Sequence, residues 1–330
     1  GNVTSYTYDD YGNLLTETDC LEYSNTSTYD AYGNILSFTD KLENTTSYTY
    51  DDDGNLLTET DAMGNISSFT YDAVGNLISS TDRNDFTTEY EYDPMNRLVK
   101  ETDPLDFEWD YEYDSNGNLV SETDKNVCVS SYEYDPLNRL IKVTDAMGGE
   151  TTSDYDEASD LISETDPLGN TTSFTYDSRG RLITETGCES FSTGYSYDPE
   201  GNLISETSKN GNTTTYEYDC LGRLISLTDA RGSTEEFEYD DTGNRVGFTD
   251  KNGNATTYEY DCLGRLVQTT DPASNQETYE YDQVGNRLST TDKNGNTTSY
   301  EYDDLGRLVK TTDPAGLYES RTYDPEGNIS

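Results

Sequence analysis

Hydrophobic and polar residues alternate along this chain in short stretches that recur at a fixed spacing. In "SYTYD" and "TTSYEY" the tyrosines stand two residues apart, so their side chains project from one face of an extended strand. A second kind of stretch, such as "LVKTT", is rich in aliphatic and β-branched residues, which favour strands. No segment shows an apolar period of 3.6 residues, so the pattern predicts almost no helix.

The pair Tyr-Asp recurs every 21 residues, without insertion or deletion, and defines sixteen copies of one unit. An internal repeat of this length is typical of a repeat architecture rather than of an ordinary globular domain. At 21 residues per copy, the 330 residues amount to about 15.7 repeats, and we expect residues 1–330 to form a single continuous array that is truncated at both ends. The invariant columns begin at Tyr8 and Asp9, the aliphatic column runs from Leu15 to Val309, and the threonine column runs from Thr18 to Thr312.

Each repeat contains two predicted turns. One reads Y-D-x-x-G-[NR], as in "YDDYGN", and the other reads T-D-x-x-G-N, as in "TDAMGN". The carboxylate of Asp can accept hydrogen bonds from backbone N–H groups two residues further on, and Gly readily adopts the left-handed conformation that closes a tight turn. In the first turn, Gly is replaced only by Asn96, Asn138 and Ser159. The unit is therefore a β-hairpin of two short strands.

Sixteen hairpins predict about 31 strands, whereas open twisted sheets rarely exceed about ten strands without curling or splitting. A flat sheet of this size would leave both faces bare. We therefore predict an all-β chain of tandem 21-residue hairpins in a continuous, curled or spiral antiparallel sheet, like a tube or a solenoid. The two aromatic columns are expected to line the shielded face as its core, together with the aliphatic residue seven positions after the Tyr.

Copies such as "YDCLGRLISLTDARGSTEEFEYD" resemble the YD repeats of the Rhs family over essentially the whole chain. This resemblance implies a secreted or surface protein whose hairpins form a spiralling sheet around a hollow interior. Some members of the family enclose a toxin, and the related teneurins are adhesion proteins of the cell surface. The segment "DPAGLYESRTYDPEGN" at 313–328 faintly resembles the terminal core of such a shell.

Composition and charge narrow the classes of function. Hydrophobic residues make up 31% of the chain, and 30 of them are tyrosines, so much of the apolar surface carries hydroxyl groups. The net charge of −47 argues against nucleic acid as a partner, because phosphate binding needs clustered Lys and Arg. No apolar run approaches the roughly 20 residues of a transmembrane helix. The chain begins at Gly1, inside a repeat, so we expect a mature product or a piece of a longer protein.

Catalytic chemistry is nearly absent from the sequence. There is no His, which excludes serine triads, Cys–His pairs and zinc sites built on His. The irregular copy "TTSDYDEASD" at 151–160 gathers Asp154, Asp156, Glu157 and Asp160, and we interpret it as a degenerate repeat rather than a site. We therefore predict no enzymatic activity, no catalytic residues and no cofactor-binding residues.

Calcium is the one candidate metal. The two "DKNGN" turns at 250–254 and 292–296 offer the hard oxygen ligands of Asp250, Asn252, Asp292 and Asn294. They do not follow the EF-hand loop, because the Gly comes too early and the terminal Glu is missing. Capping of the turn by Asp is the competing interpretation.

A period of 42 residues, two hairpins, overlies the shorter one. Arg97, Arg139 and Arg181 begin a series in which Arg occupies every second Y-D turn up to Arg307. A basic side chain at this spacing relieves the repulsion within a stripe of aspartates. Most N-x-[ST] sequons share the same period, which would place glycans on one ridge, although G-N-x-T is also good turn chemistry. The candidate glycosylation sites are Asn2, Asn25, Asn44, Asn65, Asn170, Asn212, Asn254, Asn296 and Asn328.

The five cysteines predict no closed disulfide framework, since their number is odd and no C-x-x-C pair occurs. We interpret them as small residues tolerated at variable loop positions. They are Cys20, Cys128, Cys188, Cys220 and Cys262.

Together these features predict an extracellular or cell-surface structural repeat protein that forms a filament or tubular fibre with an acidic, N-glycosylated surface. Its main partner would be further copies of itself, joined end to end or laterally, because both ends leave sheet edges uncapped. Two alternatives remain: a segment of an Rhs-type hollow shell that encloses a toxin, and a teneurin-like adhesion ectodomain. Neither nucleic acid nor membrane insertion is expected.

Overall fold

The fold is known from a computed structural model that describes residues 3–330. All of its regular structure is β: 31 strands belong to one sheet, and no helix occurs in the described range. Accordingly, residues 3–330 contain no helix long and apolar enough to cross a membrane. The first strands of the hairpins are β1 (Ser5–Tyr8), β3 (Ser24–Tyr29), β5 (Thr45–Tyr50), β7 (Ile66–Tyr71), β9 (Thr87–Tyr92), β11 (Glu108–Tyr113), β13 (Val129–Tyr134), β15 (Glu150–Tyr155), β17 (Thr171–Tyr176), β19 (Ser192–Tyr197), β21 (Thr213–Tyr218), β23 (Thr234–Tyr239), β25 (Ala255–Tyr260), β27 (Gln276–Tyr281), β29 (Thr297–Tyr302) and β31 (Tyr318–Ser320).

The second strands begin six residues after the Tyr of each repeat and end at its invariant Thr. They are β2 (Leu14–Thr18), β4 (Ile35–Thr39), β6 (Leu56–Thr60), β8 (Leu77–Thr81), β10 (Leu98–Thr102), β12 (Leu119–Thr123), β14 (Leu140–Thr144), β16 (Leu161–Thr165), β18 (Leu182–Thr186), β20 (Leu203–Thr207), β22 (Leu224–Thr228), β24 (Arg245–Thr249), β26 (Leu266–Thr270), β28 (Arg287–Thr291) and β30 (Leu308–Thr312).

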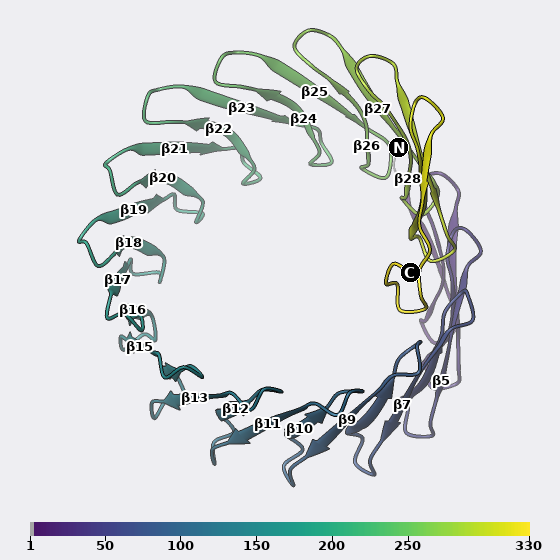
Figure 1. The fold of residues 1–330 in the computed structure, drawn as a ribbon. Coiled ribbons are helices and arrows are strands. Elements are labelled where there is room, and N and C mark those ends of the chain that lie inside the picture. Colours follow the sequence, from purple (N-terminus) through teal and green to yellow (C-terminus); the bar gives the residue numbers. More distant parts are fainter. Residues whose placement is uncertain (1–2) are drawn as a thin grey trace. The chain divides into compact units, whose positions relative to one another are not determined.

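Successive strands pair antiparallel in chain order from β1 to β9, from β10 to β23 and from β25 to β31, as the run from β15 to β22 shows in Figure 1. The Y-D turns lie at one end of the strands and the T-D turns at the other, because each strand reverses the direction of the one before. We call these two borders of the sheet the Y-D edge and the T-D edge. In each pair the five residues from the Asp onward make the turn, so that Tyr50 faces Leu56 and Thr60 faces Ile66.

The chain divides into two compact units. One comprises residues up to 90 with 239–247 and 255–330, and the other comprises 91–238 with 248–254. The first unit therefore holds hairpins from both ends of the chain, and Figure 1 draws β5 and β7 near the C-terminal hairpins. The predictions of an all-β fold, tandem hairpins and a curled antiparallel sheet are confirmed.

The aromatic columns share one face, as predicted, but they do not form a buried core. In β5, Tyr48 and Tyr50 are half-buried, whereas Thr45, Ser47 and Thr49, whose side chains lie on the opposite face of the strand, are exposed. No hydrophobic residue among those described is buried, because each unit is a single layer of sheet. The hairpins are held instead by hydrogen bonds and by half-covered rings.

The residue seven positions after the Tyr, predicted to be the packed one, is half-buried in most repeats and exposed in some. A β-bulge lies beside the Tyr, where Tyr50 pairs with Leu56 and Leu57 is the extra residue. Such a residue is left unpaired where the ladder is disrupted. In the equivalent position Leu36 and Ile78 are exposed, whereas Ile35 and Leu77, at position six, are half-buried. In β6 the two positions, Leu56 and Leu57, are both half-buried, so neither position is the packed one in every repeat.

Candidate functional site

The aspartates of the turns form the most regular polar feature of the molecule. In the turn that begins at Asp240, one carboxylate oxygen accepts hydrogen bonds from the backbone N–H groups of Thr242 (2.9 Å) and Asn244 (2.8 Å). The other oxygen accepts from Nδ2 of Asn244 at 3.0 Å. The residue three after the Asp takes a positive φ, which is 95° at Gly243. Asn96, at 61°, adopts the same conformation in its turn, since Asn tolerates it better than most residues do.

These hydrogen bonds favour the charged form of the carboxylates. The Nδ2 group of Asn244, together with the hydroxyl and backbone of Thr242, lowers the pKa of Asp240 from 3.8 to about 2. The side chain of Lys251 acts in the same way on Asp229, whose pKa also falls to about 2. The turns therefore bind fewer protons when folded than when unfolded, which links folding to pH.

Acid is expected to unfold the array over a defined range. A pKa lowered by folding gives stability that is present above the unfolded value of 3.8 and is lost as the pH falls towards about 2. Thermal melting should therefore be constant from pH 7 to about pH 5 and fall steeply between about pH 4 and pH 2. The measurement needs 0.5 M NaCl, which screens the repulsion among the acidic groups. A melting temperature that stays constant down to pH 2 would contradict this origin of stability.

Arginine side chains connect neighbouring Y-D turns in every second repeat from Arg97. Nε of Arg181 donates to Oδ2 of Asp177 at 2.7 Å within its own turn, and Nη1 donates to the backbone oxygen of Asp198 in the next turn at 2.8 Å. The guanidinium also lies over the ring of Tyr197, 4.8 Å from its centroid. In most of the alternate turns an Asn makes the bond within its own turn, as Asn202 does to Asp198 at 2.8 Å.

Replacing Arg181 separates these contributions. Arg181→Ala removes the ion pair, the bridge and the ring contact, and should destabilise the array by about 1 kcal/mol, since the pair is partly exposed. Arg181→Asn restores the hydrogen bond to Asp177 within the turn and should lower the free energy of unfolding by about half as much as Arg181→Ala does. Denaturant titration of the two variants checks this order. Equal losses would show that the bond to Asp177 contributes nothing.

The tyrosines of the Y-D column bridge neighbouring hairpins through their hydroxyl groups. The hydroxyl of Tyr176 donates to the backbone oxygen of Leu161 at 2.9 Å, and Tyr218 makes the same bond to Leu203. Burial is the main cause of the raised pKa of both tyrosines. In both cases the acceptor is the backbone oxygen of the residue six positions after the Tyr of the preceding repeat. Each repeat is thereby hydrogen-bonded to the one before it.

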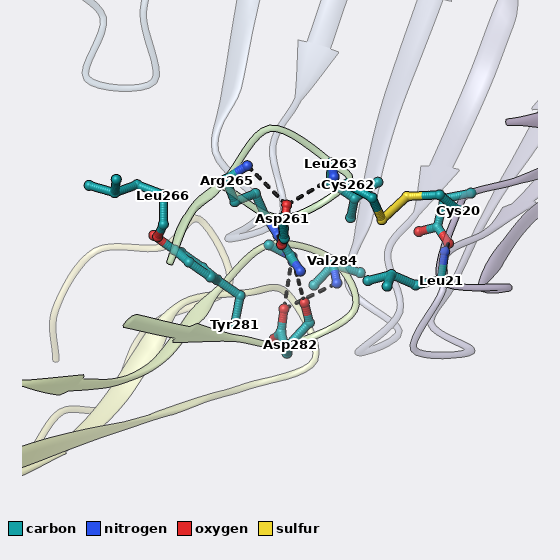
Figure 2. Close-up of polar contacts among 12 residues, drawn as sticks. Cys20, Leu21, Asp261, Cys262, Leu263, Arg265, Leu266, Tyr281, Asp282 and Val284 are labelled. Atoms are coloured by element: carbon teal, nitrogen blue, oxygen red, sulfur yellow. Dashed lines mark hydrogen bonds and ion pairs between the residues drawn. A yellow bond between two sulfur atoms is a disulfide. The ribbon is translucent and has the colours of Figure 1, made fainter. Parts of the chain in front are cut away.

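A seam joins the two ends of the chain within the first unit. Four T-D turns lie in order against four Y-D turns: 19–23 against 261–265, 40–44 against 282–286, 61–65 against 303–307, and 82–86 against 324–328. Figure 2 shows its covalent link, a disulfide between Cys20 and Cys262. The interpretation of Cys20 and Cys262 as small residues tolerated in loops is therefore wrong. The two cysteines are 242 residues apart, and disulfide pairings cannot be deduced from sequence alone.

Further contacts continue the seam in the same register. Nη2 of Arg307 lies 3.3 Å from Sδ of Met63, and Nδ2 of Asn84 lies 3.4 Å from Oδ2 of Asp324. The backbone N–H of Arg83 donates to the carboxylate of Glu326. These contacts and the disulfide all join residues 240 to 244 positions apart, so the two edges run side by side.

Apolar and charged groups both take part in the seam. Figure 2 shows the side chain of Leu21 pointing towards Val284. Leu42 lines a hollow with Val284 on one side and a second hollow with Tyr281 on the other. Asp19, which is only 6% exposed, accepts from Nζ of Lys41 at 2.7 Å. Burial tends to raise the pKa of Asp19, but the bonds from Lys41 and the backbone N–H groups of the turn outweigh it and lower the pKa.

The calcium candidates lie apart from the seam, in two exposed turns. Asp250 and Asp292 each accept hydrogen bonds from the backbone of the Asn two residues on, Asn252 and Asn294, and from the last residue of the turn. Among residues 3–330, no three His, Cys, Asp or Glu side chains lie close enough to hold a metal ion. Calcium binding stays a prediction, and unchanged melting after chelation would refute it.

The irregular copy at 151–160 forms a regular hairpin. Asp156 accepts from the backbone N–H groups of Ala158 and Asp160, and Ser159 takes the positive φ of the missing Gly, at 72°. Asp154 accepts from the hydroxyl of Ser163 across the strand pair. Glu157 is an exposed turn residue. The four acidic residues do not converge on one pocket.

Most sequon asparagines in the described range use their side chains in the turns. The Nδ2 atoms of Asn44, Asn65, Asn170, Asn254, Asn296 and Asn328 each donate to the Asp that begins the turn. Asn212 is exposed in its turn, Asn25 lies in β3, and Asn2 lies outside the described residues. The Nδ2 atom is also the atom that a glycan would occupy, so turn chemistry alone accounts for Asn at these positions. Glycosylation stays a prediction.

Comparison with known proteins finds two matching family models. A model described as Teneurin YD-shell matches residues 1–108 and 87–214. A model described as RHS Repeat matches residues 239–276, 263–297, 281–318 and 302–330. No curated protein matches the chain.

Solved structures resemble the fold over its whole length. The Tc holotoxin pore of Photorhabdus luminescens, with a mutated TccC3, has a TM-score of 0.83 at 16% identity, over 100% of this chain and 21% of that one. The crystal structure of TcdB2-TccC3 has a TM-score of 0.56 at 17% identity, over 100% of this chain and 25% of that one. A third structure, TcdB2-TccC3-Cdc42, has a TM-score of 0.55 at 16% identity, over 100% of this chain and 24% of that one. The chain thus spans about a quarter or less of these proteins, and at such identity the likeness shows the fold alone.

Proposed function

Because this chain belongs to the teneurin YD-shell family, we propose that it forms a segment of the wall of a hollow protein shell. The observation that carries the proposal is the TM-score of 0.83 to a Tc holotoxin component over the whole chain. A seam that fastens hairpins from the two ends of the chain supports the same function, since a wall must hold its curvature. The role is structural, and the natural content of the shell would be a polypeptide such as a toxin.

Electron microscopy of the purified chain tests this proposal. A wall segment should appear as a curved particle around a region of low density, whether copies are single or associated. The filament expected from sequence, in which hairpin arrays join through their strand edges, would appear as an extended ribbon. Ribbons without an enclosed space would contradict the shell and restore the filament.

We further propose that the shell works outside the cell or at its surface. The disulfide between Cys20 and Cys262 supports this, because disulfides persist in oxidising compartments and are rare in the cytosol. The test is the intact mass of the native protein before and after enzymatic removal of N-glycans. A loss of mass would support both secretion and occupied sequons, and an unchanged mass would refute the glycans.

A further inference from the structure

The seam covers one stretch of each edge and leaves the rest of both edges exposed. In the seam, the apolar residues two positions after the turn Asp are partly covered: Leu21 is 41% exposed and Leu42 is 38% exposed. The equivalent residues of the T-D edge in the second unit are bare, with Met147 at 95% and Leu168 at 86%. The Y-D edge shows the same contrast, since Leu263 is half-buried and Leu221 is 71% exposed.

The exposed stretches are continuous with the covered ones in sequence pattern and in turn geometry. The turns in the seam and outside it share one five-residue loop, closed by a hydrogen bond from the N–H of its first residue to the backbone oxygen of its fifth, as at Asp19 and Asp145. Exposed apolar side chains at turn positions that are covered in an established interface mark an interaction surface. The surface that covers a T-D edge in this molecule is a Y-D edge, and every copy of the chain carries a free stretch of each.

Two free cysteines occupy the turn positions of the bonded pair. Cys20 directly follows Asp19 in a T-D turn, and Cys188 holds the same position in the turn that begins at Gly187. Cys262 directly follows Asp261 in a Y-D turn, and Cys220 holds that position after Asp219. Both Cys188 and Cys220 are exposed thiols.

We propose that the free T-D edge of one copy docks on the free Y-D edge of a second copy, with the geometry of the seam. Placing Cys188 opposite Cys220 of the second copy fixes the register. In that register Leu105 lies opposite Leu137 of the second copy, Met147 opposite Arg179, and Leu168 opposite Glu200, and all six are exposed in the single chain. The contact is head-to-tail, so it leaves one free edge at each end and allows further copies to add.

Oxidation can lock this contact. The thiolate of Cys188 attacks a disulfide oxidant, such as oxidised glutathione, and releases one glutathione thiolate. The thiolate of Cys220 from the second copy then attacks the mixed disulfide at the sulfur of Cys188 and releases the second glutathione. Two protein thiols lose two protons and two electrons, and oxidised glutathione gains them.

The experiment uses the purified 330-residue chain in 0.5 M NaCl, where repulsion between two acidic copies is screened to a few ångströms. Light scattering should show reversible association, and oxidised glutathione should convert it to covalent dimers and larger species. Peptide mapping should find Cys188 linked to Cys220. The variants Cys188→Ser and Cys220→Ser should each lose this link, whereas Cys128→Ser, which removes another exposed thiol at a different turn position, should keep it.

A second pair of variants tests the docking without covalent chemistry. Leu168→Glu places a charge in the proposed contact and should weaken association at least about tenfold. Leu317→Glu changes an exposed residue of the last T-D turn, which has no opposite turn in this register, and should leave association unchanged. A chain that stays monomeric at all concentrations, or one that crosslinks equally through Cys128, overturns the proposal. So does a longer native chain in which Cys188 is shielded by its own further repeats.

Discussion

Removing the disulfide by the double substitution Cys20→Ser and Cys262→Ser is expected to destabilise the first unit by about 2–5 kcal/mol. The bond closes a loop of 242 residues, and its loss restores the freedom of that loop in the unfolded chain. The remaining contacts of the seam are two hydrogen bonds, from Arg83 to Glu326 and from Asn84 to Asp324, the contact of Arg307 with Met63, and partly covered apolar residues. These non-covalent contacts are weaker than the disulfide. The seam should then open transiently and expose Leu42 and Met63.

Denaturant titration and limited proteolysis measure this effect. Treatment of the unmodified protein with a reductant should reproduce the behaviour of the double variant. Cys128→Ser is the matched control, because it removes an exposed free thiol and should change stability by less than about 0.5 kcal/mol. A double variant that unfolds at the same denaturant concentration as the parent would show that the seam is not a source of stability.

Asp61→Ala is expected to give the largest loss among single turn substitutions, about 2–4 kcal/mol. Asp61 is 5% exposed, and one of its oxygens accepts the backbone N–H groups of Met63 and Asn65, both at 2.9 Å. The other oxygen accepts from Nδ2 of Asn65 at 2.9 Å and lies 3.8 Å from Nε of Arg83. Alanine would leave these donors without an acceptor in a covered part of the seam.

Two further variants make this prediction specific. Asp61→Asn keeps one acceptor oxygen for the backbone and should lose about half as much stability. Asp53→Ala removes an exposed carboxylate from the neighbouring Y-D turn and should change stability by no more than about 0.5 kcal/mol. Hydrogen exchange at Met63 and Asn65 reports the local effect. Equal exchange in Asp61→Ala and Asp53→Ala would contradict the role of burial.

The strands and the turns could be predicted from the sequence, because the interactions that form them join residues close together in the chain. The carboxylate of Asp9 accepts hydrogen bonds from the backbone N–H groups two and four residues further on, and Gly12 takes the positive φ in the same loop. The fixed 21-residue spacing then repeats one hairpin along the chain. Alternation also placed Tyr48 and Tyr50 on one face correctly.

The features that could not be predicted from the sequence depend on the exact register of strand pairing and on contacts between residues far apart in the chain. The bulge at Leu57 shifts the pairing by one residue, and both residues at the start of the strand are apolar, so composition did not decide between them. The pairing of Cys20 with Cys262 joins hairpins that are 242 residues apart, and no local pattern of residues places these two hairpins side by side. Since Cys188 and Cys220 hold equivalent turn positions, residue type could not identify the bonded pair.

Disulfide mapping of the unreduced monomer tests the central claim, that a curled sheet brings the T-D edge of the first hairpins against the Y-D edge of the last. The protein is alkylated, digested without reductant and analysed by mass spectrometry. The account predicts one linked pair, Cys20 with Cys262, and alkylated Cys128, Cys188 and Cys220. Alkylated Cys20 and Cys262, or a link from either one to another cysteine, would contradict it.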